Sequence, residues 1–372
     1  MKFSILSTGR MAEKMARTTI SKMDDAEAYA VASRSPEKAR AFADAWGFQK
    51  AYGSYGELIT DPEVELVYIA TPHSLHYENA KMCLEHGRHV LVEKPFTMNA
   101  AQAAELIAIS EAKNLLLAEG IWTRYMPSRT ILSDLLRQGV IGKVTSLTAN
   151  LGYPLTHKAR MLDPKLGGGA LLDVGVYPLN FALMAIEENV SGLFSSAVML
   201  NSGEICPNTS AGKPQETCRS SAAARPQEIQ AETSAGRPQG PIISGAAAGP
   251  EIENPAPTGV DLDNLTILKF TGGVSAFLHS SMINLLNSQG TIYGEKGFLE
   301  VQNINNCEEI RQFDNNFHLI ARHEIPEQLS GYEYEIRSCA RAIAEGRCEC
   351  PEMPHSESLR VMRLLDQIRQ QW

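Results

Sequence analysis

The chain has 372 residues, of which 44% are hydrophobic, and two domains are expected because a domain usually has about 150 residues. The net charge of −9 and the absence of a basic cluster argue against nucleic-acid binding, which needs a positive surface. The seven cysteines are scattered and lack zinc-site spacing, which predicts reduced thiols and no metal site. The amino terminus has no long apolar run, and no stretch approaches the roughly 20 apolar residues of a membrane span. We therefore expect a cytoplasmic protein without membrane association.

The first 120 residues alternate short apolar runs with helix-like segments. This alternation predicts parallel strands covered by helices, so we expect a Rossmann domain over residues 1–120. Asn99 is expected to cap the last of its helices. The expected strands are 3–7, 28–33, 66–70, 89–92 and 115–119, and the expected helices run from the first strand to about residue 23 and over 36–46, 76–87 and 100–113.

Beyond residue 121 the pattern changes to longer runs of alternating character separated by Gly-rich turns. Such runs are typical of antiparallel strands, and two amphipathic segments at the end of the chain predict helices. We therefore expect an α+β domain over residues 121–372. Its expected strands are 144–151, 265–270, 274–280 and 297–301, and its expected helices are 332–345 and 356–371.

A repeat of 12 residues interrupts the second domain at about 208–257, with TSAGKPQE at 209, SAAARPQE at 221 and TSAGRPQG at 233. The segment contains hardly any large apolar side chain. Burial therefore cannot offset an ordering entropy of about 1–2 kcal/mol per residue. We predict a disordered insertion rather than an ordered repeat array, whose units need about 20 or more residues and an apolar face.

The turn after the first strand resembles a dinucleotide-binding fingerprint. In STGRMA, Gly9 and Ala12 fit its second and third positions, and Ser7 occupies the first, which is normally glycine. Gly9 would let the backbone approach a pyrophosphate, and a helix beginning near Arg10 would direct its free N–H groups at the negative charge. The alternative is an ordinary strand–turn–helix connection.

The end of the second strand carries Ser33 and Arg34, where NAD-binding proteins place an acid on the ribose 2′-hydroxyl. An acid would repel a 2′-phosphate, whereas a guanidinium can pair with it. The sequence thus favours NADP over NAD, unless Arg34 is an ordinary solvated residue.

Two further motifs, ATPHSLH (70–76) and VEKP (92–95), follow the expected third and fourth strands, at the edge where parallel sheets bind ligands. Together with WTRYMP (122–127) and GGGALLDVGVYP (167–178), they make the chain resemble the family of glucose–fructose oxidoreductases, inositol dehydrogenases and rhizopine-catabolism proteins. Within this family the chain is most similar to the branch of dimeric dihydrodiol dehydrogenases and 1,5-anhydrofructose reductases. The resemblance continues after the repeat at TGVD (258–261), YGEKGFLEV (293–301) and GYEYEI (331–336).

The resemblance implies a Rossmann domain, a second domain with an open, mainly antiparallel sheet, NADP as cofactor and a homodimer or larger homo-oligomer formed through that sheet. It assigns the catalytic roles to Lys94, Asp173 and Tyr177, and it places His76 and Trp122 beside the nicotinamide and the substrate. Two departures are Ser7 in place of glycine and a tyrosine where many sugar-specific members have histidine. The residues expected to bind the dinucleotide are Ser7, Gly9, Arg10, Met11, Ser33, Arg34, Lys38, Thr71, Pro72, His73, His76, Glu93, Lys94, Trp122 and Arg124.

The expected chemistry fits these residues. Removing hydride from a carbinol carbon requires a base, and a tyrosine with a pKa near 10 is a weak one. Lowering that pKa to about 7 takes roughly 4 kcal/mol, which an ammonium about 4 Å away supplies at an effective dielectric of about 20. We assign this role to Lys94.

Asp173 is expected to orient the substrate or the lysine, and His157 and Arg160 to lie close enough to touch the substrate. Each residue also has an ordinary interpretation: a solvated lysine, a core tyrosine, or a histidine that caps a helix.

The sequence therefore predicts an NADP-dependent oxidoreductase that acts on a secondary alcohol carbon of a sugar, inositol or cyclic diol. One alternative is a catalytically silent regulatory protein that keeps the fold and binds a dinucleotide or sugar. Another is an enzyme that retains its cofactor and shuttles hydride between two sugars.

Overall fold

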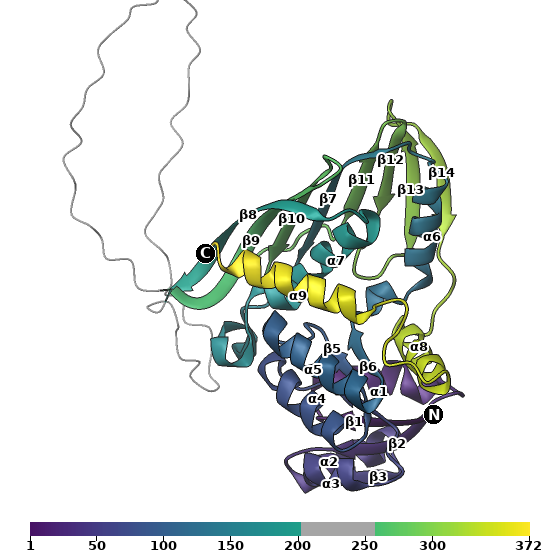
Figure 1. Cartoon of the computed structure of the whole chain (residues 1–372), viewed down its shortest axis with the longest axis vertical. Coiled ribbons are helices and arrows are strands. Elements are labelled where there is room, and N and C mark those ends of the chain that lie inside the picture. Colours follow the sequence, from purple (N-terminus) through teal and green to yellow (C-terminus); the bar gives the residue numbers. More distant parts are fainter. Residues whose placement is uncertain (202–256) are drawn as a thin grey trace, which may run out of the picture. The chain divides into compact units, whose positions relative to one another are not determined.

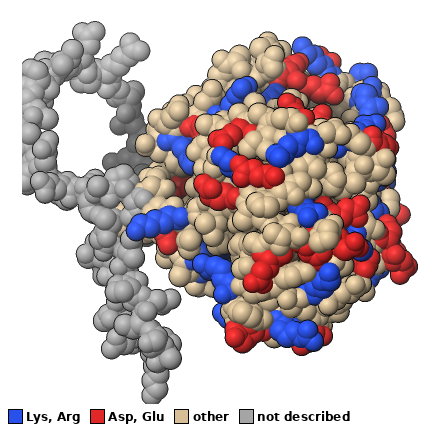
Figure 2. Space-filling view, turned by 60° about the horizontal axis from the view of Figure 1, so that its bottom comes forward, with Lys and Arg blue, Asp and Glu red and all other residues tan. Residues whose placement is uncertain are grey.

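A computed structural model describes residues 1–201 and 257–372, and residues 1–200 and 257–372 form one compact unit. The repeat insertion predicted from the sequence lies outside the described residues. Figure 1 shows the arrangement of the helices and strands. On the face seen in Figure 2, basic and acidic side chains are interspersed.

The amino-terminal part is a parallel sheet with the strand order β3-β2-β1-β4-β5-β6. Its strands are β1 (Lys2–Leu6), β2 (Glu27–Ala32), β3 (Lys50–Tyr52), β4 (Leu66–Ile69), β5 (His89–Glu93) and β6 (Leu117–Gly120), and its helices are α1 (Arg10–Thr18), α2 (Pro36–Trp46), α3 (Tyr55–Thr60), α4 (His76–Glu85) and α5 (Ala100–Lys113). The order matches a Rossmann sheet. Every strand and helix that the sequence predicted here is present, and the Asn99 cap is confirmed, since its side chain accepts the Gln102 N–H at 2.9 Å.

Two elements of this sheet escaped the sequence analysis. The strand β3 has three residues, and none of them is fully buried, so it carries no apolar run. The helix α3 has six residues and begins at a serine cap, Ser54, whose hydroxyl accepts the Glu57 N–H. Elements this short show less than two helical turns or strand repeats of periodicity.

The second sheet is mixed, with the strand order β14-β13-β12-β11-β7-β10-β9-β8. The strands β7 and β10 pair in parallel, and the pairs β10–β9, β7–β11, β11–β12, β12–β13 and β13–β14 are antiparallel. A mainly antiparallel sheet was expected. The strands are β7 (Val144–Gly152), β8 (Val190–Asn201), β9 (Pro257–Phe270), β10 (Ser275–Ser281), β11 (Gly290–Gly294), β12 (Gly297–Val301), β13 (Glu309–Asp314) and β14 (Leu319–Glu324).

Four α-helices accompany this sheet: α6 (Pro127–Arg137), α7 (Val176–Ala185), α8 (Glu333–Ala344) and α9 (His355–Arg369). A π-helical turn at Leu171–Gly175 leads directly into α7. The stretch Pro164–Ala185 is long and apolar enough to cross a membrane by length and composition alone, but 94% of its most apolar 18-residue part is buried inside the protein. This stretch forms part of the core of the second sheet.

The carboxyl-terminal helices pack against the Rossmann part rather than only on the second sheet. In Figure 1, α9 lies between the second sheet and α5. The Asp366 carboxylate accepts the Ala100 N–H at 2.8 Å. At the edge strand β6, the Leu117 N–H donates to the Cys348 carbonyl at 2.9 Å, and the His355 ring lies 2.9 Å from the Leu117 carbonyl. The open edge of the first sheet is thereby covered, which blocks pairing with other chains.

Candidate active site

The carboxyl ends of the strands in the first sheet meet along one edge. Leu6 of β1 pairs with Ala32 of β2 and with Ile69 of β4, and Ile69 pairs with Val92 of β5. Because the strands are parallel and in register, the motifs that follow them leave the sheet side by side.

The turn between β1 and α1 fits a dinucleotide pyrophosphate. Ser7 adopts a φ of 108°, a conformation that glycine usually provides, and its hydroxyl accepts the Gly9 N–H at 3.1 Å. This bond offsets part of the strain and explains how serine can replace the first glycine. Gly9 is the N-cap of α1 and no side chain caps this helix, so N–H groups of its first turn are available to an anion. Arg10 is exposed and Met11 is half-buried.

The end of β2 carries no acid. Ser33 is buried and lies 3.4 Å from the Thr8 hydroxyl, while Arg34 is exposed. Ser35 caps α2 by accepting the Lys38 N–H at 3.3 Å, and the Lys38 side chain is exposed. A helix N-terminus beside a free guanidinium suits a 2′-phosphate.

His73 joins the two parts of the molecule. Its Nδ1 lies 2.8 Å from the Gly167 carbonyl, and its Nε2 lies 3.5 Å from Oδ1 of Asp173. A Cβ on Gly167 would lie 2.8 Å from the His73 Cβ, so this contact requires glycine. His73 was expected only at the cofactor, but it also contacts a proposed catalytic residue.

The structure does not bring His76 to the site, contrary to the sequence analysis. The ring is 0% exposed, with Nδ1 2.8 Å from the Pro95 carbonyl and Nε2 3.1 Å from the Thr71 carbonyl. Burial lowers the pKa of His76 to about 3, so the neutral ring can donate to only one of the two carbonyls. His76 therefore connects the loops that follow β4 and β5 from inside the protein, where it cannot touch substrate.

Arg124 is also placed elsewhere than expected. It is buried, and it donates to the Asn180 side chain at 2.8 Å and to Glu357 at 3.2 Å. These partners belong to α7 and α9. The guanidinium therefore stabilises the packing of the second part and is not directed at a dinucleotide.

Two other residues expected to bind the cofactor are buried and bonded within the protein. Glu93 accepts the Tyr68 hydroxyl, and burial raises the pKa of Glu93. The Thr71 hydroxyl accepts the Asn79 amide at 3.2 Å. Pro72, between Thr71 and His73, is half-buried.

Asp173 is the centre of the charged group. Its Oδ1 lies 3.4 Å from the Lys94 ammonium, 3.3 Å from the Arg160 guanidinium and 3.5 Å from the His73 ring. Burial alone would raise the pKa of Asp173, but Lys94, His73 and Arg160 hold it well below its usual range. Among the described residues, none hydrogen-bonds the second carboxylate oxygen. Asp173 is thus an ionised carboxylate held in one position, and its second oxygen can still accept a hydrogen bond.

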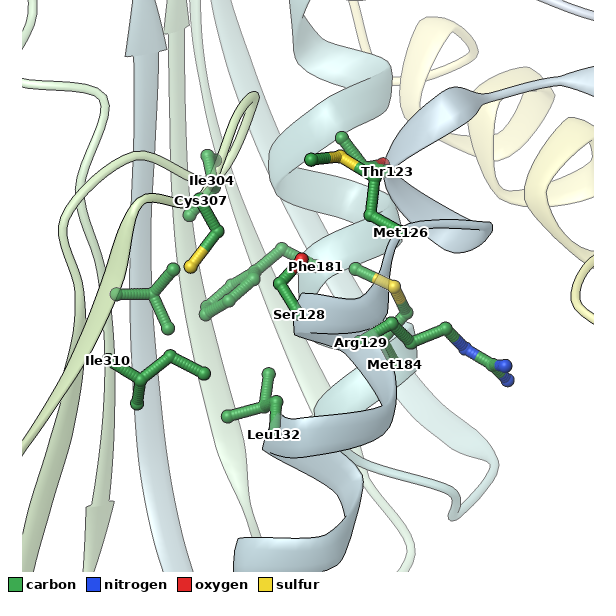
Figure 3. A pocket seen from close by; sticks show the side chains of 11 residues that line it. Thr123, Met126, Ser128, Arg129, Leu132, Phe181, Met184, Ile304, Cys307 and Ile310 are labelled. Atoms are coloured by element: carbon green, nitrogen blue, oxygen red, sulfur yellow. The ribbon is translucent and has the colours of Figure 1, made fainter. Parts of the chain in front are cut away.

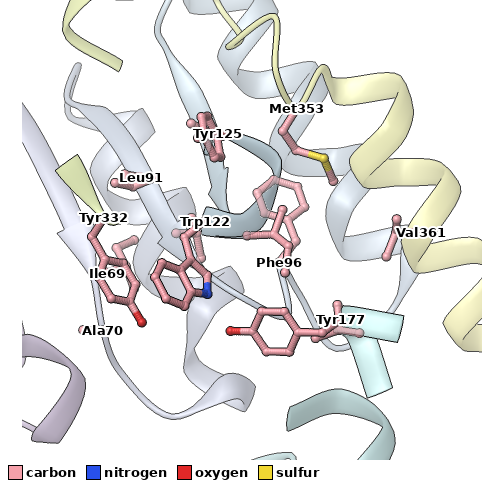
Figure 4. Close-up of a cluster of buried hydrophobic side chains, with 14 of the residues drawn as sticks. Ile69, Ala70, Leu91, Phe96, Trp122, Tyr125, Tyr177, Tyr332, Met353 and Val361 are labelled. Atoms are coloured by element: carbon pink, nitrogen blue, oxygen red, sulfur yellow. The ribbon is translucent and has the colours of Figure 1, made fainter. Parts of the chain in front are cut away.

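Tyr177 lies four residues after Asp173, one turn further along the π-helical turn and α7. π-helical turns are frequent at functional sites. The Lys94 ammonium lies 5.1 Å from the centre of the Tyr177 ring, and the Trp122 indole lies beside the Tyr177 hydroxyl (Figure 4). Figure 4 shows the hydroxyl directed at the indole nitrogen.

The expected effect of Lys94 on Tyr177 is not found. Burial raises the pKa of Tyr177 well above its usual range, and the charges of Tyr332, Glu93 and Asp173 act in the same direction. The reason is that the Lys94 ammonium bonds Asp173 and faces the tyrosine ring rather than its hydroxyl. Tyr177 therefore keeps its proton at neutral pH in this structure.

Three residues that no sequence motif indicated as part of the site lie around Trp122. The Tyr332 ring stacks on the indole with centroids 4.3 Å apart and an interplanar angle of 6°. The Lys14 ammonium donates to the Tyr332 hydroxyl at 3.0 Å, and the indole N–H lies 3.3 Å from the Asn305 side-chain oxygen. Tyr332 belongs to the GYEYEI motif, which was noticed only for its resemblance, and Lys14 follows Arg10 by one helical turn.

His157 is exposed, and among the described residues it has no hydrogen-bond partner, so it stays a prediction as a substrate contact. An apolar cavity of about 20 Å³ lies between α6, α7 and the second sheet (Figure 3). None of the candidate residues lines it. It has room for about one water molecule and is far too small for a sugar.

Comparison with known proteins agrees with this architecture. Residues 1–121 match the family model for the GFO/IDH/MocA oxidoreductases with an NAD-binding Rossmann fold, and residues 131–210 match the model of the C-terminal domain of that family. A trans-1,2-dihydrobenzene-1,2-diol dehydrogenase from Xenopus laevis is 30% identical over 100% of this chain and 97% of its own length.

A D-xylose 1-dehydrogenase (NADP(+)) from Hypocrea jecorina is 40% identical over 50% of this chain and 53% of its own length. Two solved structures share the fold. An aldose-aldose oxidoreductase from Caulobacter crescentus has a TM-score of 0.77 at 20% identity, covering 100% of this chain and 97% of its own. A 3-ketoreductase from Actinomadura kijaniata has a TM-score of 0.76 at 23% identity with the same coverage.

The parallel sheet with its dinucleotide turn, the second mixed sheet and these matches lead to one assignment. The chain belongs to the GFO/IDH/MocA oxidoreductase family and is a nicotinamide-dinucleotide-dependent oxidoreductase that acts on CH–OH groups.

Proposed function

We propose that the chain transfers hydride between NADP and a secondary alcohol carbon of a sugar, inositol or cyclic diol, with Tyr177 as the acid/base. One observation carries the proposal. Lys94 from the end of β5 meets Asp173 at 2.6 Å and 3.4 Å, and it lies over the ring of Tyr177 one turn further on. This arrangement joins the edge of the dinucleotide-binding sheet to two side chains of the second part.

The residues present fit the dinucleotide. The uncapped start of α1 at Gly9 would hold the pyrophosphate, and Ser33 with Arg34 would hold the 2′-phosphate. Lys94 and Trp122 would face the nicotinamide end. When bound, the nicotinamide carries the hydride. The D-xylose dehydrogenase relative is named for NADP(+), and the 3-ketoreductase was solved with NADP, which supports the same cofactor here.

In the reductive direction, Tyr177 donates its proton to the carbonyl oxygen that becomes the alcohol. The raised pKa keeps this proton on the hydroxyl until it is needed. Lys94 then stabilises the negative charge that develops beside the ring. In the oxidative direction, Tyr177 takes up the alcohol proton, and it must first be deprotonated, which its burial opposes.

The polar and aromatic sides of the site suit a cyclic polyol. The free oxygen of Asp173 can accept a substrate hydroxyl, and Arg160 can donate to a second one. The stacked rings of Trp122 and Tyr332 would supply apolar surface beside Tyr177 (Figure 4). The relatives named above act on a dihydrodiol and on xylose, which are compact molecules with neighbouring hydroxyls.

The open face of the second sheet supports a homodimer or larger homo-oligomer. It exposes Phe194, Val198, Leu265 and Phe277 at 60%, 55%, 55% and 46%. Large apolar side chains grouped on one surface usually mark a protein–protein contact. A cytoplasmic location is also part of the proposal, and the free thiols of the five described cysteines are consistent with it.

The test is a screen of purified protein by cofactor fluorescence, with NADP and NAD, against pentoses, hexoses, inositols, anhydro-sugars, trans-diols and the matching ketones. Turnover of at least one class, absent in Tyr177→Phe, is expected. A protein that binds NADP and sugars without turnover would be the catalytically silent alternative. Nucleotide released only on denaturation, with hydride moved between two sugars, would identify the shuttling enzyme.

A further inference from the structure

A short segment of the second part, Leu329–Glu333, forms a tight turn that we call the clasp. The Glu333 carboxylate is buried and accepts the N–H groups of Leu329 at 2.8 Å, Ser330 at 3.1 Å and Gly331 at 2.7 Å. Three main-chain bonds to one carboxylate fix the conformation of the turn. The clasp can therefore hold its side chains in one position.

The clasp is attached to the end of α1 in the Rossmann part. The Ser330 hydroxyl lies 2.7 Å from the hydroxyl of Thr19, and the Tyr332 hydroxyl accepts the Lys14 ammonium at 3.0 Å. α1 is the helix whose amino terminus is proposed to hold the pyrophosphate. A shift of this helix would therefore move the clasp.

The clasp also fixes the plane of the Trp122 indole. The Tyr332 ring stacks on it, and the Lys14 ammonium lies 4.7 Å from the Tyr332 ring centre and 5.4 Å from that of Trp122. Gly331 has a φ of 93°, and a Cβ there would lie 2.6 Å from the indole. The turn backbone thus packs directly against the ring, and Figure 4 shows Tyr332 beside it.

The position of the Trp122 indole in turn affects the proposed acid/base, Tyr177. The indole nitrogen lies beside the Tyr177 hydroxyl (Figure 4), and the indole N–H donates to the Asn305 side-chain oxygen at 3.3 Å. A rotation of the indole by a few tens of degrees would change the direction of its N–H relative to both groups, and hydrogen bonds weaken steeply with angle.

We propose that Lys14 and Tyr332 are positioning residues that hold the Trp122 indole beside the Tyr177 hydroxyl, which couples the cofactor-binding helix to proton transfer. The role of Tyr177 in this inference rests on the proposed function. Neither Lys14 nor Tyr332 is asked to touch the reacting atoms. Cation–π contact and stacking together are strong enough to select one orientation of an indole.

The contact between the Lys14 ammonium and the two aromatic rings should also depend on pH. Desolvation lowers the pKa of Lys14 from its ordinary value; nearby Lys94 and Arg17 lower it further, and Glu93 raises it. Once Lys14 loses its proton, its cation–π contacts vanish. Trp122 should therefore report this titration below the pH at which ordinary lysines lose theirs.

The kinetic test compares Lys14→Met, Lys14→Arg, Tyr332→Phe and Tyr332→Leu with Arg17→Met, an exposed cation of the same helix, as the matched control. We expect Lys14→Met and Tyr332→Leu to lower kcat about tenfold with KM changed less than about twofold, since small misplacements act on the chemical step. Lys14→Arg should restore most of the loss, and Arg17→Met should behave as wild type. Melting temperatures separate these effects from unfolding, and Tyr332→Phe keeps the stack if Tyr332→Leu does not fold.

The second readout is independent of turnover. In protein labelled with 5-fluorotryptophan, the three tryptophans give separate fluorine resonances, and Trp122→Phe identifies one of them. The Trp122 resonance should titrate in wild type and stay constant in Lys14→Met. A resonance that is the same in both proteins would overturn the proposal whatever the activity. A lost titration with an unchanged kcat would also overturn it, because the contact would then be structural only. If wild type turned over no substrate, the proposed function would fail, while the resonance would still decide whether Lys14 holds Trp122.

Discussion

The Lys94 ammonium donates to the main-chain carbonyl of Asp173 at 2.6 Å and lies 3.4 Å from the carboxylate of the same residue. One residue thus offers two acceptors to one cation. Because the carbonyl belongs to a π-helical turn, where the helical i→i−4 bonds are interrupted, it is free to accept a side chain. The lysine is consequently held in place before any ligand arrives, which lowers the entropic cost of organising the site.

Tyr177→Phe should lower turnover by about 100-fold or more while NADP affinity changes little, because the hydroxyl acts in proton transfer. Steady-state kinetics and cofactor titration by fluorescence measure the two effects. Tyr77→Phe, which removes only an exposed hydroxyl bonded to Glu105, is the control. Equal losses of turnover and cofactor affinity would contradict the assigned role.

Asp173→Asn should reduce kcat by about 10- to 100-fold and raise KM for polyols. The amide removes the charge that holds Lys94, Arg160 and His73 together, and it leaves three donors without their anion. Asp163→Asn in the neighbouring turn, whose carboxylate caps the Lys165 N–H, serves as the control. A variant with wild-type kcat and KM would remove Asp173 from the site.

Arg34→Asp should weaken NADP binding far more than NAD binding, because it places a negative charge where the 2′-phosphate is proposed to lie. Titration of both dinucleotides gives the ratio of dissociation constants. Arg40→Asp changes an exposed arginine of the helix that follows, α2, which pairs with Asp44, and should leave the ratio unchanged. If the two arginine variants behaved alike, the effect would be one of general charge.

The buried carboxyl of Glu119 makes stability depend on pH. It is 1% exposed, neither of its oxygens has a hydrogen-bond partner that meets ordinary geometry among the described residues, and burial raises its pKa to about 7 although Ser358 and the Phe96 main chain lower it. The folded state therefore binds the proton more tightly than the unfolded state. The free energy of unfolding is therefore unaffected by the ionisation of Glu119 below the unfolded pKa of about 4.5. As the pH rises to about 7, this free energy falls, by about 3 kcal/mol in total.

Glu119→Gln should remove this dependence. Between pH 5 and pH 8, the free energy of unfolding of the variant should improve relative to wild type by about 2 kcal/mol, as measured by urea denaturation. Glu105→Gln is the control: hydrogen bonding to Lys81 lowers the pKa of Glu105, so this carboxylate is ionised in both states over most of the range and the pH profile should stay close to that of wild type. Parallel pH profiles for wild type and Glu119→Gln would contradict the prediction.

The periodic part of the fold could be predicted from the sequence. The strands and long helices of the Rossmann part have strong patterns, and the Asn99 cap is a local signal. The prediction missed α7 as a helix, because Val176–Ala185 is apolar all round and eight of its ten residues are buried. A segment buried on every side shows no amphipathic period.

The candidate site could be predicted only in part. The order of the motifs predicts that Lys94, Asp173 and Tyr177 belong to one site, and in the structure these residues lie close together. The motifs do not say which way a side chain turns, so His76 and Arg124 were placed at the cofactor although both point into the protein. Tyr332 and Lys14 are 318 residues apart, and no local pattern indicates a contact over that distance.

The covered edge of β6 has a consequence for how the chain acquires its structure. The main-chain partner of Leu117 is Cys348, and Leu117 also faces His355, both near the end of the chain. A ribosome delivers the chain from its amino terminus at about 5–20 residues per second, so the first sheet is synthesised well before the residues that close its side. During that interval the residues that cover the β6 edge have not yet been made. Completion of the dinucleotide-binding domain is thereby tied to the synthesis of residues 348–355.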